Sequence, residues 1–105
     1  MIALLGASAL SSHTAFAAKL NVKCGKDAYE VEMLICQDEE LARLDVSLTS
    51  LYLTVLKNTP SAQKRQLRAE QSGWVKGRND CWKAADQRTC VKGGYETRIK
   101  ELKDR

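Results

Sequence analysis

Apolar residues recur at intervals of three and four along the middle of the chain, as they do on the buried face of an amphipathic helix. Their positions are Leu41, Leu44, Leu48, Leu51, Tyr52 and Val55. Asp38 stands just before them, where its side chain can cap the first helical turn. Glu39 and Glu40 add negative charge in that turn, which the helix dipole favours. The pattern predicts a long helix from Asp38 to about Asn58.

A second helix is expected to start at Thr59-Pro60 and to run to about Lys83. Threonine can cap a helix, and proline at the first helical position loses no needed hydrogen bond. Its inward face would hold Leu67, Gln71, Trp74, Arg78 and Cys81, with Val75 and Trp82 beside them. Because the connection to the preceding helix is so short, the two helices should fold back as a long antiparallel hairpin.

Two shorter helices are expected to flank this hairpin. The first, Asp27 to Ile35, begins with a capping-box-like spacing. It would turn inward Ala28, Val31, Leu34 and Ile35. The second, roughly Val91 to Leu102, carries on its apolar stripe Val91, Tyr95, Ile99 and Leu102. No segment shows a sustained alternation of β-branched residues. The sequence therefore predicts an all-α fold, a small helical bundle built on the hairpin.

The N-terminal residues have the pattern of a secretory signal peptide over residues 1–17. An apolar run is followed by Ala15-Phe16-Ala17, which places small residues before a cut after Ala17. The run is too short to span a bilayer as a mature helix, and the alternative is a buried N-terminal helix. Residues 18–105 would then form one periplasmic or secreted domain. Cys24 follows Leu20-Asn21-Val22-Lys23 instead of small residues, so we expect no membrane anchor in the mature form.

Four cysteines, Cys24, Cys36, Cys81 and Cys90, fit disulfide bonds in an oxidising compartment. A domain of this size has a marginal core, and crosslinks are the usual remedy. Sequence alone permits three pairings. The local pairing joins Cys24 to Cys36 and Cys81 to Cys90, whereas the nested pairing joins Cys36 to Cys81 and Cys24 to Cys90. We favour the local pairing, since its loops close near helix ends without strain, provided that the helix between Cys24 and Cys36 is short.

Several chemistries lack the residues they need. The cysteines do not occur in close pairs, which argues against a zinc site and against dithiol redox catalysis. The single histidine, His13, lies in the expected signal peptide, so the mature chain has no imidazole for nucleophile activation. A carboxylate pair could still act on a glycoside. The candidates are Glu32, Asp38, Glu39, Glu40 and Asp45. Most of them sit at helix starts, where capping explains them, and we expect no enzyme and no cofactor.

Asp45 and Arg78 are charged residues on faces that are otherwise apolar. The hairpin brings them within about one helical turn of each other, near enough for a charge-assisted and even bidentate hydrogen bond. We interpret them as a structural ion pair in preference to a ligand site. Trp74 and Trp82 are read as core anchors, or as a contact surface if either faces solvent.

The net charge of +4 is spread along the chain. Nucleic-acid binders usually concentrate basic residues on one face or in one run. Here Lys and Arg alternate with Asp and Glu along the predicted helices, which is typical of a solvated surface. The composition gives no reason to expect a nucleic-acid partner.

The chain also resembles the LprI-like N-terminal domain family over about Cys24 to Leu102. The resemblance rests on an ordered set of short motifs. They are Cys24-x-Lys26-x-Ala28, Glu32-x-x-Ile35-Cys36, Leu41-x-x-Leu44-Asp45, Tyr52, Gln71-x-x-Trp74, Arg78-x-x-Cys81, Cys90 and Tyr95-x-x-Arg98-Ile99-x-x-Leu102. The family consists of small, helical, cysteine-bridged proteins of the bacterial envelope, and its namesake is a lipoprotein that inhibits lysozyme.

This resemblance implies a protein that acts by binding another protein, with a lysozyme as the first candidate partner. The net charge of +4 would repel the commonly basic lysozymes at long range, so attraction would have to be local. Candidate contact residues are Asp38, Glu39, Glu40 and Trp82. The alternative is an envelope structural or adaptor protein that binds an unknown partner through an apolar or aromatic face and does not inhibit lysozyme.

Overall fold

The computed structural model describes residues 20–105, and these residues contain α-helices but no β-strand. The helices are α2 (Glu30–Gln37), α3 (Glu39–Asn58), α4 (Ser61–Asn79) and α5 (Gln87–Lys103). A short 3-10 helix, η1 (Asp80–Lys83), continues α4. The all-α prediction is confirmed. The predicted signal peptide, residues 1–17, lies outside the described residues.

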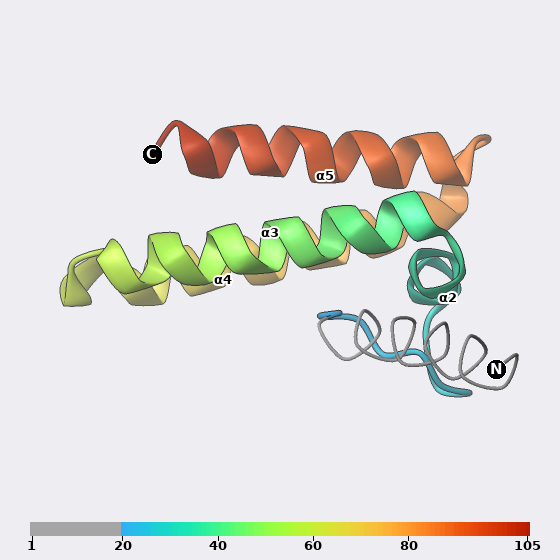
Figure 1. The fold of residues 1–105 in the computed structure, drawn as a ribbon, viewed down its shortest axis with the longest axis horizontal. Helices are drawn as coiled ribbons and strands as arrows, with labels where there is room; N and C mark the ends of the chain where they lie inside the picture. Colours follow the sequence, from blue (N-terminus) through green and yellow to red (C-terminus); the bar gives the residue numbers. More distant parts are fainter. Residues whose placement is uncertain (1–19) are drawn as a thin grey trace, which may run out of the picture.

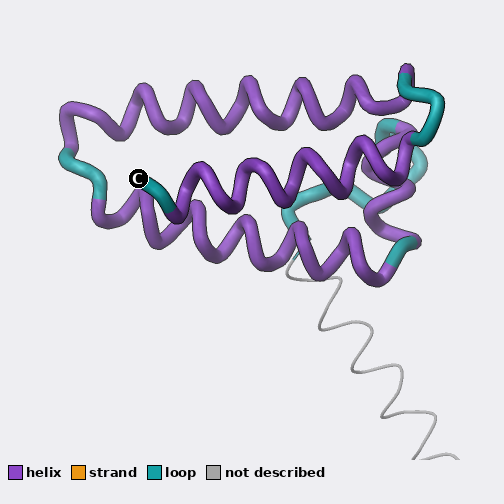
Figure 2. Tube along the Cα trace, turned by 90° about the horizontal axis from the view of Figure 1, so that it is seen from above, coloured by secondary structure: helices purple, strands orange, loops and turns teal. Residues whose placement is uncertain are grey.

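The long helices α3 and α4 form the expected antiparallel hairpin, and α5 runs along it (Figure 1). Seen from above, α5 lies between the other two long helices and packs against both (Figure 2). Helix α2 is seen end on in Figure 1, at the end of the bundle where α3 begins. The hairpin therefore becomes a stable core only when α5 covers its inner face.

The core collects the apolar stripes of all four helices. Its fully buried side chains are Val31, Ile35, Leu41, Leu48, Leu67, Val91, Tyr95 and Leu102. Val22, in the segment before α2, packs on the same cluster. The helix periodicity therefore identified most of the buried positions. It placed Trp82 beside the inward face of α4, however, and that residue is 56% exposed.

The two disulfides have the local pairing. Cys24 is bonded to Cys36, with their Cα atoms 5.8 Å apart, and Cys81 is bonded to Cys90 at 5.7 Å. Both distances fall in the ordinary range for a disulfide. The first bond ties the segment before α2 to the last turn of that helix. The second closes the η1 turn onto the first turn of α5.

The starts of α2 and α4, like that of α5 described below, differ from the prediction. Helix α2 begins at Glu30 instead of Asp27, since Ala28 bonds back to the Gly25 carbonyl in a turn at 3.0 Å. Before α4, the Thr59 hydroxyl donates to the Val55 carbonyl at 2.6 Å, so it closes α3 and does not cap α4. Pro60 takes the N-cap position of α4.

Helix α5 begins at Gln87, four residues earlier than Val91. Asp86 caps its first turn, because the Thr89 N–H donates to Asp86 Oδ1 at 3.0 Å. The start of α3 is as predicted, with the Leu41 N–H donating to Asp38 Oδ1 at 3.1 Å. Helical structure continues to Lys83, where the second helix was predicted to end, but its last four residues form the 3-10 helix η1.

Candidate functional site

Asp45 and Arg78 lie together inside the bundle, bridged by a tyrosine that the sequence analysis placed only in the apolar stripe. Arg78 Nη1 is 3.8 Å from Asp45 Oδ1, beyond hydrogen-bonding distance. Tyr95 Oη donates to Asp45 Oδ1 at 2.8 Å and accepts from Arg78 Nη1 at 3.2 Å. Asp45 and Arg78 thus lie at ion-pair distance, but the direct hydrogen bond expected between them is absent, because the tyrosine hydroxyl joins the two charges.

The Tyr95 hydroxyl is held as a donor. Its pKa is raised, chiefly because burial disfavours the phenolate; Arg78 opposes this shift and the nearby Asp45 charge adds to it. The ring also meets Trp74 edge to face, with centroids 5.1 Å apart. Trp74 Nε1 in turn donates to the Gly94 carbonyl at 3.2 Å. The network thus binds α3, α4 and α5 together.

The same network reaches the surface in two directions. The Asn21 N–H donates to Asp45 Oδ2 at 2.6 Å, which fixes the segment before α2. Arg78 donates from Nε and Nη2 to Asn79 Oδ1, at 3.1 and 2.8 Å. Both bonds occupy the amide oxygen, so the amide NH₂ of Asn79 is left to face away from Arg78. Asn79 lines the groove described next.

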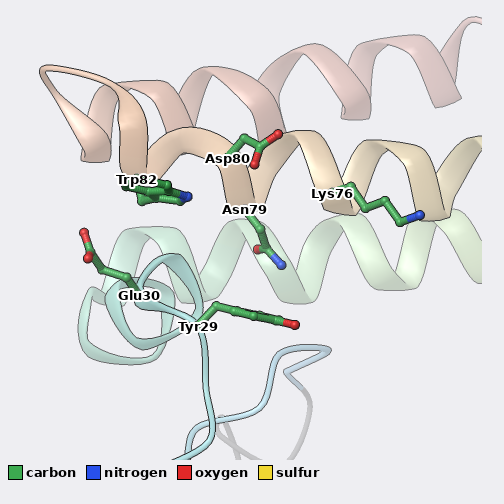
Figure 3. A pocket seen from close by; sticks show the side chains of 6 residues that line it. All are labelled: Tyr29, Glu30, Lys76, Asn79, Asp80 and Trp82. Carbon is green, nitrogen blue, oxygen red and sulfur yellow. The ribbon is translucent and has the colours of Figure 1, made fainter.

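An open groove of about 580 Å³ lies between the start of α2 and the end of α4. Its lining residues are Tyr29, Glu30, Lys76, Asn79, Asp80 and Trp82. Figure 3 shows the rings of Tyr29 and Trp82 on opposite sides of the opening, both nearly edge on. They are 68% and 56% exposed. Because large aromatic side chains are seldom left this exposed together, the groove is the best candidate contact surface.

Each wall of the groove is held by its own disulfide. Tyr29 lies within the loop closed by Cys24–Cys36, and its N–H donates to Glu32 Oε1 at 3.0 Å. Trp82 follows the buried Cys81 in the loop closed by Cys81–Cys90. Across the two loops, Gln87 Nε2 donates to Glu30 Oε2 at 2.6 Å. The exposed rings are therefore presented by crosslinked backbone.

The predicted acidic contact residues are occupied within the molecule. Arg88 Nε donates to Asp38 Oδ2 at 2.7 Å, and Arg88 Nη2 donates to Glu40 Oε1 at 2.5 Å. Lys92 Nζ is 3.4 Å from Glu40 Oε2. The Arg88 hydrogen bond is the main cause of a lowered pKa for both Asp38 and Glu40. These bonds tie the start of α3 to the start of α5.

The third acidic residue, Glu39, pairs with Arg43 one turn further along α3. The negative charge at this end of the bundle is thus matched by Arg43, Arg88 and Lys92. None of these three carboxylates lines the groove in which Trp82 lies. That these carboxylates contact a partner stays a prediction.

The remaining carboxylates offer no obvious metal site. Among residues 20–105, no group of three or more His, Cys, Asp or Glu side chains is placed to hold a metal ion. No helix in the same range is both long and apolar enough to cross a membrane.

Sequence reasoning missed Tyr29, Arg88 and the bridging role of Tyr95. Tyr95 could have been found, since a buried tyrosine hydroxyl needs a partner and the same core was predicted to hold two charges. Arg88 lies before Val91, the predicted start of the last helix, because the sequence pattern did not identify Asp86 as the cap of that helix. Tyr29 carried no signal, since only the fold places it opposite Trp82.

Comparison with known proteins places the chain in a family. The family model described as "Lysozyme inhibitor LprI" matches residues 23–102. Proteins named "Lipoprotein LprI" from Mycobacterium bovis and Mycobacterium tuberculosis are 38% identical over 82 residues, which cover 78% of this chain. The chain spans about 40% of the length of these relatives. No solved structure matches. The chain therefore belongs to the LprI family of lysozyme inhibitors.

Proposed function

We propose that this protein is exported, binds a lysozyme and inhibits it, without hydrolytic activity of its own. The family match over residues 23–102 supports the inhibitory role. The lipoprotein names of the relatives support a place in the bacterial envelope or outside it, periplasmic or secreted. The pair of disulfides fits an oxidising compartment of this kind.

The observation that carries a binding role, for a lysozyme or for another envelope protein, is the groove between Tyr29 and Trp82. Tryptophan and tyrosine are enriched among residues that dominate protein–protein binding energy, because they offer large contact area with few rotatable bonds. Here both rings are exposed, and the backbone that carries each lies within a disulfide-closed loop. Docking on such a surface needs little reordering, which reduces the entropy lost on binding.

The charges favour the groove as the contact surface over the acidic residues at the start of α3. Asp38, Glu39 and Glu40 are all paired with cations of the same molecule, so a basic partner would have to displace those cations. The net charge of +4 repels the commonly basic lysozymes. Contact through aromatic area does not depend on charge, but the long-range repulsion between the two molecules remains. Salt should therefore speed association by screening the long-range repulsion.

The test is inhibition of lysozyme by the oxidised protein. Clearing of a peptidoglycan suspension is followed at rising concentrations of the protein, and the association rate with immobilised lysozyme is measured at low and high salt. We expect saturating inhibition and an association rate that rises with salt. No inhibition of any lysozyme class at micromolar protein would favour the envelope-adaptor function. Clearing of peptidoglycan by the protein alone would contradict both.

A further inference from the structure

Helix α4 carries a row of basic residues on one flank. Lys64, Arg68, Ser72 and Lys76 are spaced by four, so their side chains follow one another along the same face. Arg65 stands three residues before Arg68 and joins the row. Arg65, Arg68 and Lys76 are exposed and Lys64 is half-buried. The row spans about 18 Å of a helix that rises about 1.5 Å per residue. We call these four cations the α4 basic row.

No member of the α4 basic row forms an ion pair among the described residues, although Glu30 and Asp80 line the same groove as Lys76. All other arginines of residues 20–105 form ion pairs, with the partners Glu39, Asp45, Asp38, Glu101 and Glu70. Glu70, the one acidic residue of α4, is 2.7 Å from Arg105 and so is already engaged. The ion pairs of residues 20–105 include none with Lys64, Arg65, Arg68 or Lys76. The unpaired positive charge of this helix is therefore concentrated on one flank.

This arrangement disfavours the helix that bears it. Lys64 and Arg68 are four residues apart, and like charges at that spacing repel. Lys64 and Arg65 also lie near the N-terminus of α4, where the helix dipole favours negative charge. Helix α3 shows the favourable arrangement, with Glu39 and Glu40 in its first turn. A local cost with no compensation inside the molecule is typical of a functional surface.

The straight shape of the α4 basic row fits a flat, charged surface. Several small, exposed residues lie near the cations in the sequence: Ser61, Ala69, Ser72 and Gly73. The long basic side chains can thus reach outward past them. Helix α4 runs without a visible kink in Figure 2. A straight row of this kind matches an array of charges on a flat surface better than one small anion.

We propose that the α4 basic row docks the molecule on a bilayer surface through the headgroups of anionic phospholipids. Basic side chains near such a surface are attracted by its negative potential, and the attraction falls off within a Debye length. Single-stranded nucleic acid would be met by aromatic rings all along a charged groove, whereas exposed rings lie only at the Lys76 end of the α4 basic row, where Tyr29 and Trp82 line the groove. Surface docking can be tested apart from the proposed inhibition, because Arg65 and Arg68 do not line the groove, whereas Lys76 belongs to both surfaces.

The test compares two variants of equal net charge. Arg65→Glu with Arg68→Glu reverses the α4 basic row. Lys26→Glu with Lys103→Glu reverses two exposed cations that also form no ion pair, but lie on other elements. Binding of each protein is measured by sedimentation with vesicles of phosphatidylcholine alone and of phosphatidylcholine mixed with phosphatidylglycerol. Circular dichroism melting checks that both variants fold.

We expect the unchanged protein to bind only the phosphatidylglycerol vesicles, and to lose binding at about 1 M salt, where the Debye length is ~3 Å. Reversal of the row should weaken binding by about tenfold or more, and the control by about threefold or less. An equal loss in both variants would overturn the proposal, since net charge alone would then explain it. So would absence of vesicle binding, including the case in which the protein instead binds soluble polyphosphate or an acidic protein.

Discussion

Tyr29 and Trp82 face each other across one groove although 53 positions separate them in the sequence. Each lies inside a different disulfide loop, and the hydrogen bond from Gln87 to Glu30 joins the two loops. The disulfides therefore do more than stabilise a small core. They hold the segments that carry the two rings on opposite sides of one groove.

Removal of the Cys81–Cys90 bond should affect both stability and the groove. We expect Cys81→Ser with Cys90→Ser to lower the free energy of unfolding by about 2 to 5 kcal/mol, as in other small secreted domains. Urea denaturation measures the loss. Peptide mapping of the unreduced protein should recover Cys81 linked to Cys90, and a Cys36–Cys81 peptide would contradict the pairing described here.

Removal of the bridging hydroxyl of Tyr95 should lower the free energy of unfolding, because it also leaves two buried charged groups short of a hydrogen-bond partner. Tyr95→Phe leaves the ring in place but removes a partner from Asp45 and from Arg78, both of which are buried. We expect a loss of about 1 to 3 kcal/mol in unfolding free energy. The matched control, Tyr52→Phe, removes a hydroxyl from a half-buried ring and should change stability little. Equal effects of the two substitutions would show that the bridge has no special role.

Asp45→Ala should be more damaging than Tyr95→Phe. It leaves the Arg78 guanidinium buried without a carboxylate, and it also releases the Asn21 N–H. Breaking a buried pair in this way commonly costs about 3 to 5 kcal/mol. Thermal melting gives the stability, and lysozyme inhibition is measured beside it. An unchanged melting midpoint together with lost inhibition would show that Asp45 acts in binding and not in the stability of the fold.

Acid should weaken the link between α3 and α5. The hydrogen bond from Arg88 is the main cause of the lowered pKa of Asp38, so the folded pKa lies below the unfolded one. The stabilisation is present above the unfolded pKa of about 3.9 and is lost as pH falls through the folded pKa. Arg88→Ala should therefore reduce stability at about pH 7 and much less at about pH 2. A reduction of the same size at both values would contradict the pairing.

The bundle could largely be predicted from the sequence, because helix formation depends on local periodicity that Leu41 to Val55 display clearly. The groove could not be predicted. Trp82 was placed beside the apolar face by helical extrapolation, but the change to a 3-10 turn at Asp80 rotates it outward. The pairing of Asp38 and Glu40 with Arg88 depends on a helix start that was predicted four residues too late.

The most direct test of the account is lysozyme inhibition by the variant Tyr29→Ala with Trp82→Ala. The control is Leu53→Ala, which removes the third large exposed apolar side chain, on α3 and outside the groove. Melting midpoints of all proteins are compared to ensure that each is folded. We predict that the double variant loses at least about 2 kcal/mol of binding free energy, as expected for binding hot spots, while the control inhibits like the unchanged protein. Full inhibition by the folded double variant would contradict the assignment of the groove.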